Sequence, residues 1–271
     1  SLVPAEDSGS MLVFPNLEVG DVVYIEYDYY SNSYGRFYKD FTSGFTFNGS
    51  YPVVESLFTI IHDPSLDLKI TSKNGNVKLT EKKLNKKVLK QWKQENVSSI
   101  PIYESYAPEY EDLTEAVNVG TIKSWSVIAD WYADLVKKNI KYDRITQNTF
   151  KEIFPNGSNG LSETEKAEKI YRYICDNITY SFLDFRQSGY VPQKPSKTIT
   201  TKLGDCKDLS TLFVTLAEEA GLQANLVLVL TNDNGFKALS LPSKDFNHCI
   251  VRVLIDGKET FLEMTDRYLP F

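Results

Sequence analysis

Histidine and cysteine are scarce in this chain of 271 residues, which holds two histidines and three cysteines. These five residues are scattered and show none of the usual zinc-ligand spacings, so we expect no metal site. No loop carries the acidic spacing of an EF-hand, so the sequence predicts no calcium site and no cofactor. If one cysteine stays free, at most one disulfide can form, and the cysteine count does not decide the compartment.

Long apolar runs are also missing. No stretch approaches the roughly 20 apolar residues of a membrane span, and the N-terminus lacks the basic and apolar regions of a signal peptide. The sequence starts without Met and ends at Tyr268-Leu269-Pro270-Phe271. We therefore expect a mature or trimmed form, truncated at the C-terminus and followed by a further domain of the same protein.

An excess of positive charge is absent. The net charge is -6 and the isoelectric point is near 5.2, so we expect no nucleic-acid partner. The stretch 78–93 is rich in lysine and contains Trp92. We interpret it as a solvated face of a strand or helix.

What is present is enough apolar surface for two ordinary cores, with 42% hydrophobic and 13% aromatic residues. Tyr, Phe and Val gather in short runs at 21–30 and 37–47, which is strand composition. After Val119 the pattern changes to helices over 125–140 and 162–178. We predict an α+β chain with a β-rich, β-sandwich-like domain at 1–119 and a domain of helices plus antiparallel sheet at 120–271.

Cys206 stands at the start of an amphipathic helix. The sequence Gly204-Asp205-Cys206-Lys207-Asp208 leads into apolar residues at helical spacing, and Gly221 supplies the stop. Asp205 is the predicted N-cap, and Asp208 can complete a capping box. Free N–H groups and the helix dipole at this position favour a thiolate over a thiol, and the Cys206 N–H can donate to an oxyanion.

His248 is the predicted base for this thiol. It begins a β-branched-rich run that ends at Asp256-Gly257, a strong hairpin signal, and residues 259–263 form the return strand. With a two-residue turn His248 lies opposite Thr265 and shares a face with Glu263, which could orient the imidazole. A three-residue turn would bring Asp266 opposite His248 instead, so both acids remain candidates.

The other thiols and the other histidine have ordinary interpretations. Cys175 lies on the apolar face of a predicted helix and is expected in the core. Cys249 points to the opposite face of its strand from His248 and is expected to pack. His62 follows an apolar run and precedes Asp63-Pro64, so we place it at a strand end or turn.

These motifs resemble the Cys, His and acid blocks of the transglutaminase-like superfamily. The three blocks are Gly204-Asp205-Cys206-Lys207-Asp208, Asn247-His248-Cys249 and Phe261-Leu262-Glu263-Met264-Thr265. The third block in that superfamily usually reads aromatic-x-Asp-Pro-Thr, and here Glu263 and Met264 take the Asp and Pro positions. The preceding half resembles a β-rich domain of unknown function that often comes before such domains in bacterial envelope proteins.

The resemblance implies a papain-like, transglutaminase-like fold and cysteine-dependent acyl transfer on peptide or protein amides through a thioester. An amine acceptor gives a crosslink and water gives hydrolysis, as in a peptidase; the sequence does not choose between them. It also implies a periplasmic or cell-envelope location. The competing hypothesis is a silent binding or scaffolding module, favoured by Glu263 and by a loop such as 232–244 closing over the thiol. Gln193 and the aromatic residues around Tyr180 are candidates for a second oxyanion donor.

Overall fold

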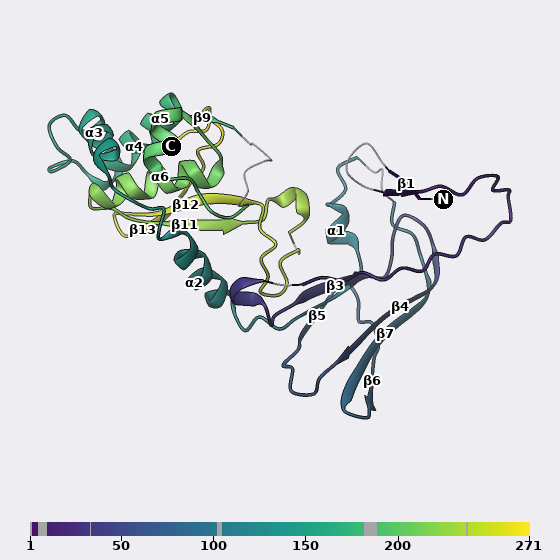
Figure 1. Cartoon of the computed structure of the whole chain (residues 1–271). Coiled ribbons are helices and arrows are strands. Elements are labelled where there is room, and N and C mark those ends of the chain that lie inside the picture. Colours follow the sequence, from purple (N-terminus) through teal and green to yellow (C-terminus); the bar gives the residue numbers. More distant parts are fainter. Residues whose placement is uncertain (1, 5–9, 33, 102–104, 182–188, 237) are drawn as a thin grey trace. The chain divides into compact units, whose positions relative to one another are not determined.

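The computed structural model describes residues 2–4, 10–32, 34–101, 105–181, 189–236 and 238–271 (Figure 1). The chain divides into two compact units, residues 1–38 and 39–271. No helix in the described ranges is long and apolar enough to cross a membrane.

The first unit has little regular structure. β1 (Leu2–Pro4) pairs antiparallel with β2 (Ser10–Leu12), and a single 3-10 turn, η1, spans Gly35–Phe37. The predicted strand at 21–30 is wrong, since these residues form no strand and their side chains are exposed. Strand composition is not sufficient, because an extended segment needs a neighbouring strand to pair its backbone groups.

The second unit begins with two three-stranded antiparallel sheets, ordered β3-β8-β5 and β4-β7-β6. One small core joins them, in which the Phe58 ring stacks between Phe45 and Trp92 at centroid distances of 5.2 and 5.5 Å. β6 is exposed along its whole length, in agreement with the solvated face predicted for the lysine-rich stretch, whereas Trp92 of that stretch is buried. The strands are β3 (Thr42–Thr46), β4 (Val53–His62), β5 (Lys69–Lys73), β6 (Leu79–Leu84), β7 (Lys87–Val97) and β8 (Ala116–Gly120), with the short helix α1 (Tyr110–Leu113) before β8.

Helices dominate the rest of the chain. Two of the predicted helices are found as α2 (Trp125–Val136) and α4 (Glu163–Asn177), the latter with a capping box between Ser162 and Glu165. Two more were not predicted, α3 (Arg144–Ile153) and α5 (Pro195–Thr201). Their signals were present: the Asp143 side chain accepts from two backbone N–H groups of α3, and Pro195 occupies the first turn of α5.

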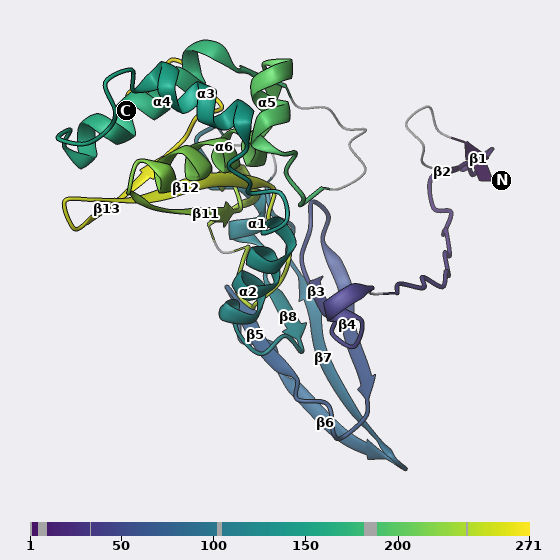
Figure 2. The same ribbon diagram turned by 60° about the vertical axis from the view of Figure 1, so that its left-hand side comes forward.

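The central helix of this part is α6 (Cys206–Glu219), which packs on a three-stranded antiparallel sheet ordered β11-β12-β13. Figure 2 shows α3, α4 and α5 on the side of α6 away from that sheet. The sheet consists of β11 (Gln223–Val229), β12 (His248–Ile255) and β13 (Lys258–Leu262), and the 3-10 turn η2 spans Asn232–Asn234. The confirmed fold is therefore mixed, with helices and mainly antiparallel sheets; β9 (Thr179–Tyr180) and β10 (Leu203–Gly204) form one short parallel pair.

Candidate active site

Cys206 is the first residue of α6, as the sequence predicted. The Asp205 side chain accepts from the backbone N–H of Asp208, and the Asp208 carboxylate accepts from the Asp205 N–H at 3.1 Å, which completes the capping box. Lys207 pairs with the other Asp205 oxygen. The helix start is therefore fixed by buried polar contacts, while the Cys206 side chain itself is half-buried.

Asp208 also holds the segment that precedes α5. Its Oδ1 atom accepts from the backbone N–H of Gln193 at 2.8 Å. The Gln193 side-chain amide donates to the Leu203 carbonyl at 2.8 Å. The amide of Gln193 is thus used inside the protein, so Gln193 is a weaker candidate for a second oxyanion donor than the sequence indicated.

The hairpin register is the one predicted for a two-residue turn. Ile255 pairs with Lys258 and Val251 with Leu262, so extension of the same register brings His248 opposite Thr265. Asp256 and Gly257 have φ values of 50° and 75°, the left-handed conformation that such a turn requires. His248 and Glu263 consequently lie on one face of the sheet, with His248 on the middle strand β12 and Glu263 directly after the edge strand β13.

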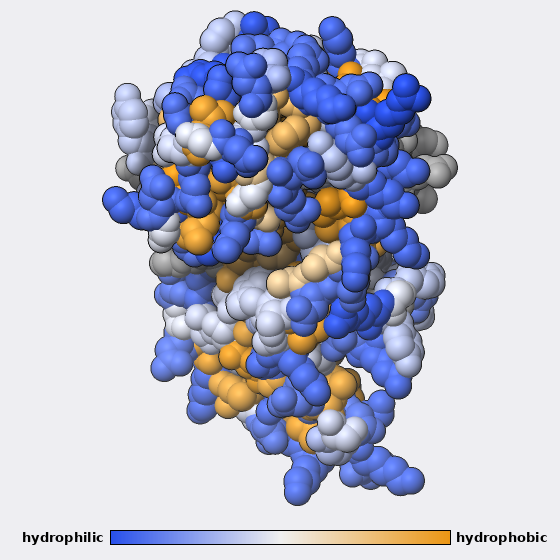
Figure 3. Space-filling model, turned by 90° about the vertical axis from the view of Figure 1, so that its left-hand side faces the viewer, coloured by the Kyte–Doolittle hydropathy of each residue, from blue (hydrophilic) through white to orange (hydrophobic). Residues whose placement is uncertain are grey.

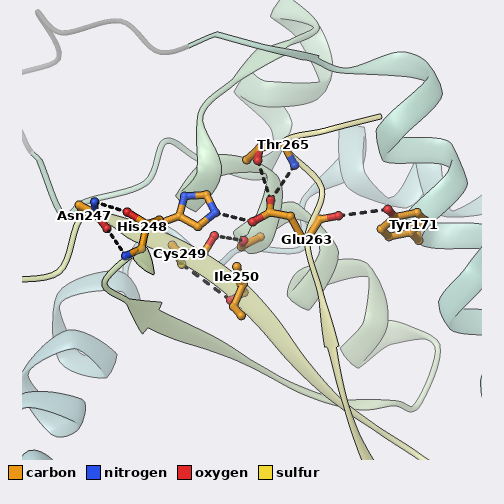
Figure 4. Close-up of polar contacts among 9 residues, drawn as sticks. Tyr171, Asn247, His248, Cys249, Ile250, Glu263 and Thr265 are labelled. Carbon is orange, nitrogen blue, oxygen red and sulfur yellow. Dashed lines mark hydrogen bonds and ion pairs between the residues drawn. The ribbon is translucent and has the colours of Figure 1, made fainter. Parts of the chain in front are cut away.

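Glu263 contacts the His248 ring through Nε2 (Figure 4). Its second oxygen, Oε1, accepts from the backbone N–H and the hydroxyl of Thr265 at 2.8 and 2.7 Å. Asp266, the alternative acid, instead accepts from the Tyr268 N–H at 2.9 Å. The structure therefore brings Glu263, and not Asp266, to the imidazole.

The backbone of Glu263 is also held by a hydrogen bond. Tyr171, a buried residue of α4, donates from its hydroxyl to the Glu263 carbonyl at 3.1 Å. Sequence reasoning missed this contact, because the contact joins residues far apart in the chain. Thr265 keeps the Thr of the third motif, and this match could have identified Thr265 as a residue of the site.

The pKa of His248 is strongly raised by its two polar neighbours. A hydrogen bond with the Cys206 side chain, followed by the one with Glu263, raises the pKa of His248 to about 10 despite partial burial. Burial pushes the pKa of Glu263 upward, but the bonds from His248 and Thr265 outweigh it and lower that pKa below its usual value. Because Nε2 is bound by Glu263, Nδ1 is the ring nitrogen left to face the thiol.

The remaining thiols pack as predicted. Burial raises the pKa of Cys249 to about 12, and the Tyr132 hydroxyl lies 3.9 Å from its sulfur. Burial likewise raises the pKa of Cys175. His62 ends β4 and its Nδ1 lies 2.8 Å from the Asp63 carbonyl oxygen.

Tyr180 lies close to the thiol. It pairs with Gly204 in the short parallel ladder, two residues before Cys206. Burial, followed by the nearby Cys206, Asp205 and Glu263, raises the pKa of Tyr180. The residue remains 37% exposed. Phe182 and Phe185, the other aromatic residues near it in sequence, lie outside the described residues.

Comparisons with known proteins agree with the resemblance seen in the motifs. Residues 151–264 match the family model of the transglutaminase-like superfamily, and this range holds Cys206, His248 and Glu263. Residues 7–101 match DUF3857, a domain of unknown function. Sequence comparison with curated proteins gives no match.

Three solved structures illustrate the similarity. A structure described as a "putative protease" from Parabacteroides distasonis has a TM-score of 0.59 at 16% identity; the alignment covers 84% of this chain and 43% of that one. A "putative cysteine protease" from Cytophaga hutchinsonii has a TM-score of 0.35 at 16% identity, covering 83% and 78%. The periplasmic domain of TgpA from Pseudomonas aeruginosa has a TM-score of 0.29 at 11% identity, covering 80% and 74%. The first of these supports the fold, and this chain spans less than half of that protein.

Proposed function

We propose that this protein is a cysteine-dependent enzyme that transfers or hydrolyses the acyl group of peptide or protein amides. Cys206 is the nucleophile, His248 the acid and base, and Glu263 the residue that orients the imidazole. The observation that carries the proposal is the series formed by the thiol, the imidazole and the carboxylate, in which Cys206 and His248 line one small cavity and Glu263 contacts the His248 ring. Nucleophile, base and orienting group in such a series are the arrangement of an activated thiol.

In the first half-reaction the Cys206 sulfur attacks the amide carbonyl carbon. The C–N bond then breaks, and His248, protonated at neutral pH because of its raised pKa, gives its proton to the leaving amine. The product is a thioester on Cys206. Glu263 holds a negative charge against the imidazolium and fixes the tautomer of the neutral imidazole.

In the second half-reaction water or an amine attacks the thioester. Neutral His248 accepts the proton of the attacking group, and the Cys206 sulfur leaves as the thiolate. Water gives hydrolysis, and an amine gives a new amide. The same three residues serve both outcomes, so the acceptor decides the product.

The tetrahedral intermediates carry an oxyanion that needs donors. Cys206 begins α6, so its N–H has no partner within the helix and is directed at that charge. We assign the second donor to the Tyr180 hydroxyl, because Tyr180 is partly exposed and electrostatically coupled to Cys206.

The test begins with the thiol. Mild iodoacetamide treatment followed by mass spectrometry compares Cys206 with Cys175 and Cys249, two buried internal controls. We expect faster alkylation of Cys206 well below pH 8, and loss of this advantage in His248→Ala. Equal rates at Cys206 in the two proteins would remove the basis of the proposal.

Turnover is measured next. Dimethylcasein with a fluorescent primary amine reports transfer, and new peptide termini report hydrolysis. Cys206→Ala is the inactive control for both. Activity retained in Cys206→Ala would show that another group carries the reaction.

A silent binding module is the second candidate. It is favoured by the small cavity at Cys206, about 30 Å³, which is roughly the share of one water in the liquid. The described residues of the loop 232–244 do not line that cavity, so this loop offers no support for the alternative. An ordinary, His248-independent thiol at Cys206 would favour the silent module.

The wider proposals concern organisation and location. We propose a boundary near residue 119 between a binding or structural β-rich domain and the catalytic domain. We also propose a periplasmic or envelope location, supported by the order of the two matched segments. Fractionation of cells with an antibody against the catalytic domain tests the location.

A further inference from the structure

A groove of about 730 Å³ lies between α2, the C-terminal half of α6, and β11. It is distinct from the small cavity at the thiol. α2 lies between the two segments that match family models, 7–101 and 151–264, so neither model includes this wall of the groove. Figure 3 shows one face of the molecule on which apolar side chains are exposed in a recess among hydrophilic ones.

The groove runs along the free edge of the sheet. Five consecutive residues of β11, Ala224 to Leu228, line it. Successive side chains of a strand point to opposite faces, so a cavity that touches all five must follow the strand edge. Within the described part of the chain, β12 alone pairs with β11. The outer backbone groups of β11 therefore face the groove.

The opposite wall of the groove carries small apolar side chains at its middle. Ala129 and Ala133 are exposed on α2, one turn apart, and both line the groove. Trp125 lines it at the start of the helix with 42% of its surface exposed. The charged lining residues are few: Asp134, Lys137 and Glu218.

The groove meets the catalytic centre. Tyr132, Leu228 and Phe246 line both the groove and the cavity that holds Cys206 and His248. β11 leads in the same direction, because its last residue, Val229, pairs with His248. A chain lying along β11 would therefore reach the thiol.

We infer that this groove binds the substrate as an extended peptide that adds to the free edge of β11 and places aliphatic or aromatic side chains against α2. The inference rests on the proposed function for the reaction that follows binding. A polypeptide backbone is the ligand that matches a row of unpaired strand N–H and C=O groups, and the apolar wall supplies side-chain selectivity. Substrates with apolar residues next to the reacting amide are thus preferred over polar ones.

Binding is tested without chemistry in the Cys206→Ala protein. The probe is a capped, fluorescein-labelled octapeptide in which Val, Phe and Leu alternate with Ser, and its control has Asn in place of the apolar residues. We expect anisotropy to give at least tenfold tighter binding of the apolar peptide. Ala133→Trp, which fills the groove, removes that preference, and Ser126→Trp, an exposed position on α2 outside the groove, leaves it unchanged.

Hydrogen exchange tests the groove without the Ala133→Trp variant, so its result does not depend on whether that variant folds. In Cys206→Ala, saturating apolar peptide should slow exchange of the β11 amides and leave those of β6 unchanged. Equal affinity for the two peptides, or no added protection in β11, would overturn the inference. If the peptide binds but Cys206 of the wild type reacts like an ordinary thiol, only the proposed reaction is refuted. If Cys206 is activated but the peptide does not bind, only the inference about the groove is refuted.

Discussion

Replacing Glu263 by Gln separates the charge of this residue from its shape. The carboxylate uses one oxygen for His248 and the other for two Thr265 donors. An amide has one oxygen and one NH₂ group. If the amide oxygen of Gln faces Thr265, its NH₂ group faces the His248 N–H, and two donors meet. If the amide oxygen faces His248, the NH₂ group faces the two Thr265 donors instead.

The magnitude follows from the lost charge-assisted bond. A hydrogen bond to a charged group contributes about 1.5–3 kcal/mol. The side chains of His248 and Glu263 are 16% and 30% exposed, so we take the lower half of that range. This amount corresponds to about one pKa unit or somewhat more, or roughly a tenfold to fortyfold shift away from the imidazolium.

The assay is the pH profile of Cys206 alkylation by iodoacetamide. We expect the Glu263→Gln profile to leave its thiolate–imidazolium plateau about one pH unit or somewhat more below wild type, because His248 loses its proton at a lower pH without the carboxylate. Glu259→Gln is the matched control, since Glu259 is an exposed residue of β13, the strand that Glu263 follows, and is paired with Arg252. Superimposable profiles for wild type and Glu263→Gln would refute the role of Glu263 in the ion pair.

The remaining predictions address other parts of the site. Activity should fall above about pH 10, because the raised pKa of His248 keeps the proton-donating form below that value; a rate that stays constant up to pH 11 would contradict this. For the same reason the stability difference between wild type and His248→Ala, measured by urea unfolding, should be full below about pH 6.5, the usual His value, and shrink as pH rises through 10. Asp208→Ala should lower the free energy of unfolding by about 2–4 kcal/mol, because the N–H groups of Gln193 and Asp205 lose a buried acceptor. Its control, Asp130→Ala at an exposed site on α2, should change the free energy of unfolding by less than about 0.5 kcal/mol. Tyr180→Phe should lower kcat by roughly 10- to 1000-fold with little change in the Cys206 alkylation profile; an unchanged kcat would exclude Tyr180 as an oxyanion donor.

The local parts of the site were predictable from the sequence. Asp205 as N-cap, Cys206 on the first turn and the Asp256-Gly257 turn are set by residues within a few positions of each other. Such features depend on capping chemistry and on turn geometry, which short motifs encode directly. The position of Glu263 beside His248 then follows from counting along the two strands.

The distant contacts were not predictable. The bonds from Tyr171 to Glu263 and from Gln193 to Asp208 join separate elements, and no local pattern encodes their meeting. The predicted strand at 21–30 failed for the same reason, because composition indicates strand preference but not a pairing partner. The groove along β11 depends on where α2 lies, which the helical spacing of α2 alone does not reveal.

The way the reactive groups are distributed along the chain has a consequence during synthesis. His248 and Glu263 belong to one hairpin and can meet as soon as that hairpin closes, whereas Cys206 belongs to a separate helix of 14 residues. A helix of that length is marginal on its own in water and gains its stability by packing. The thiol therefore meets its imidazole only after α6 has docked on the sheet. The nascent chain thus carries an ordinary cysteine, and strong nucleophilicity arises together with the folded state.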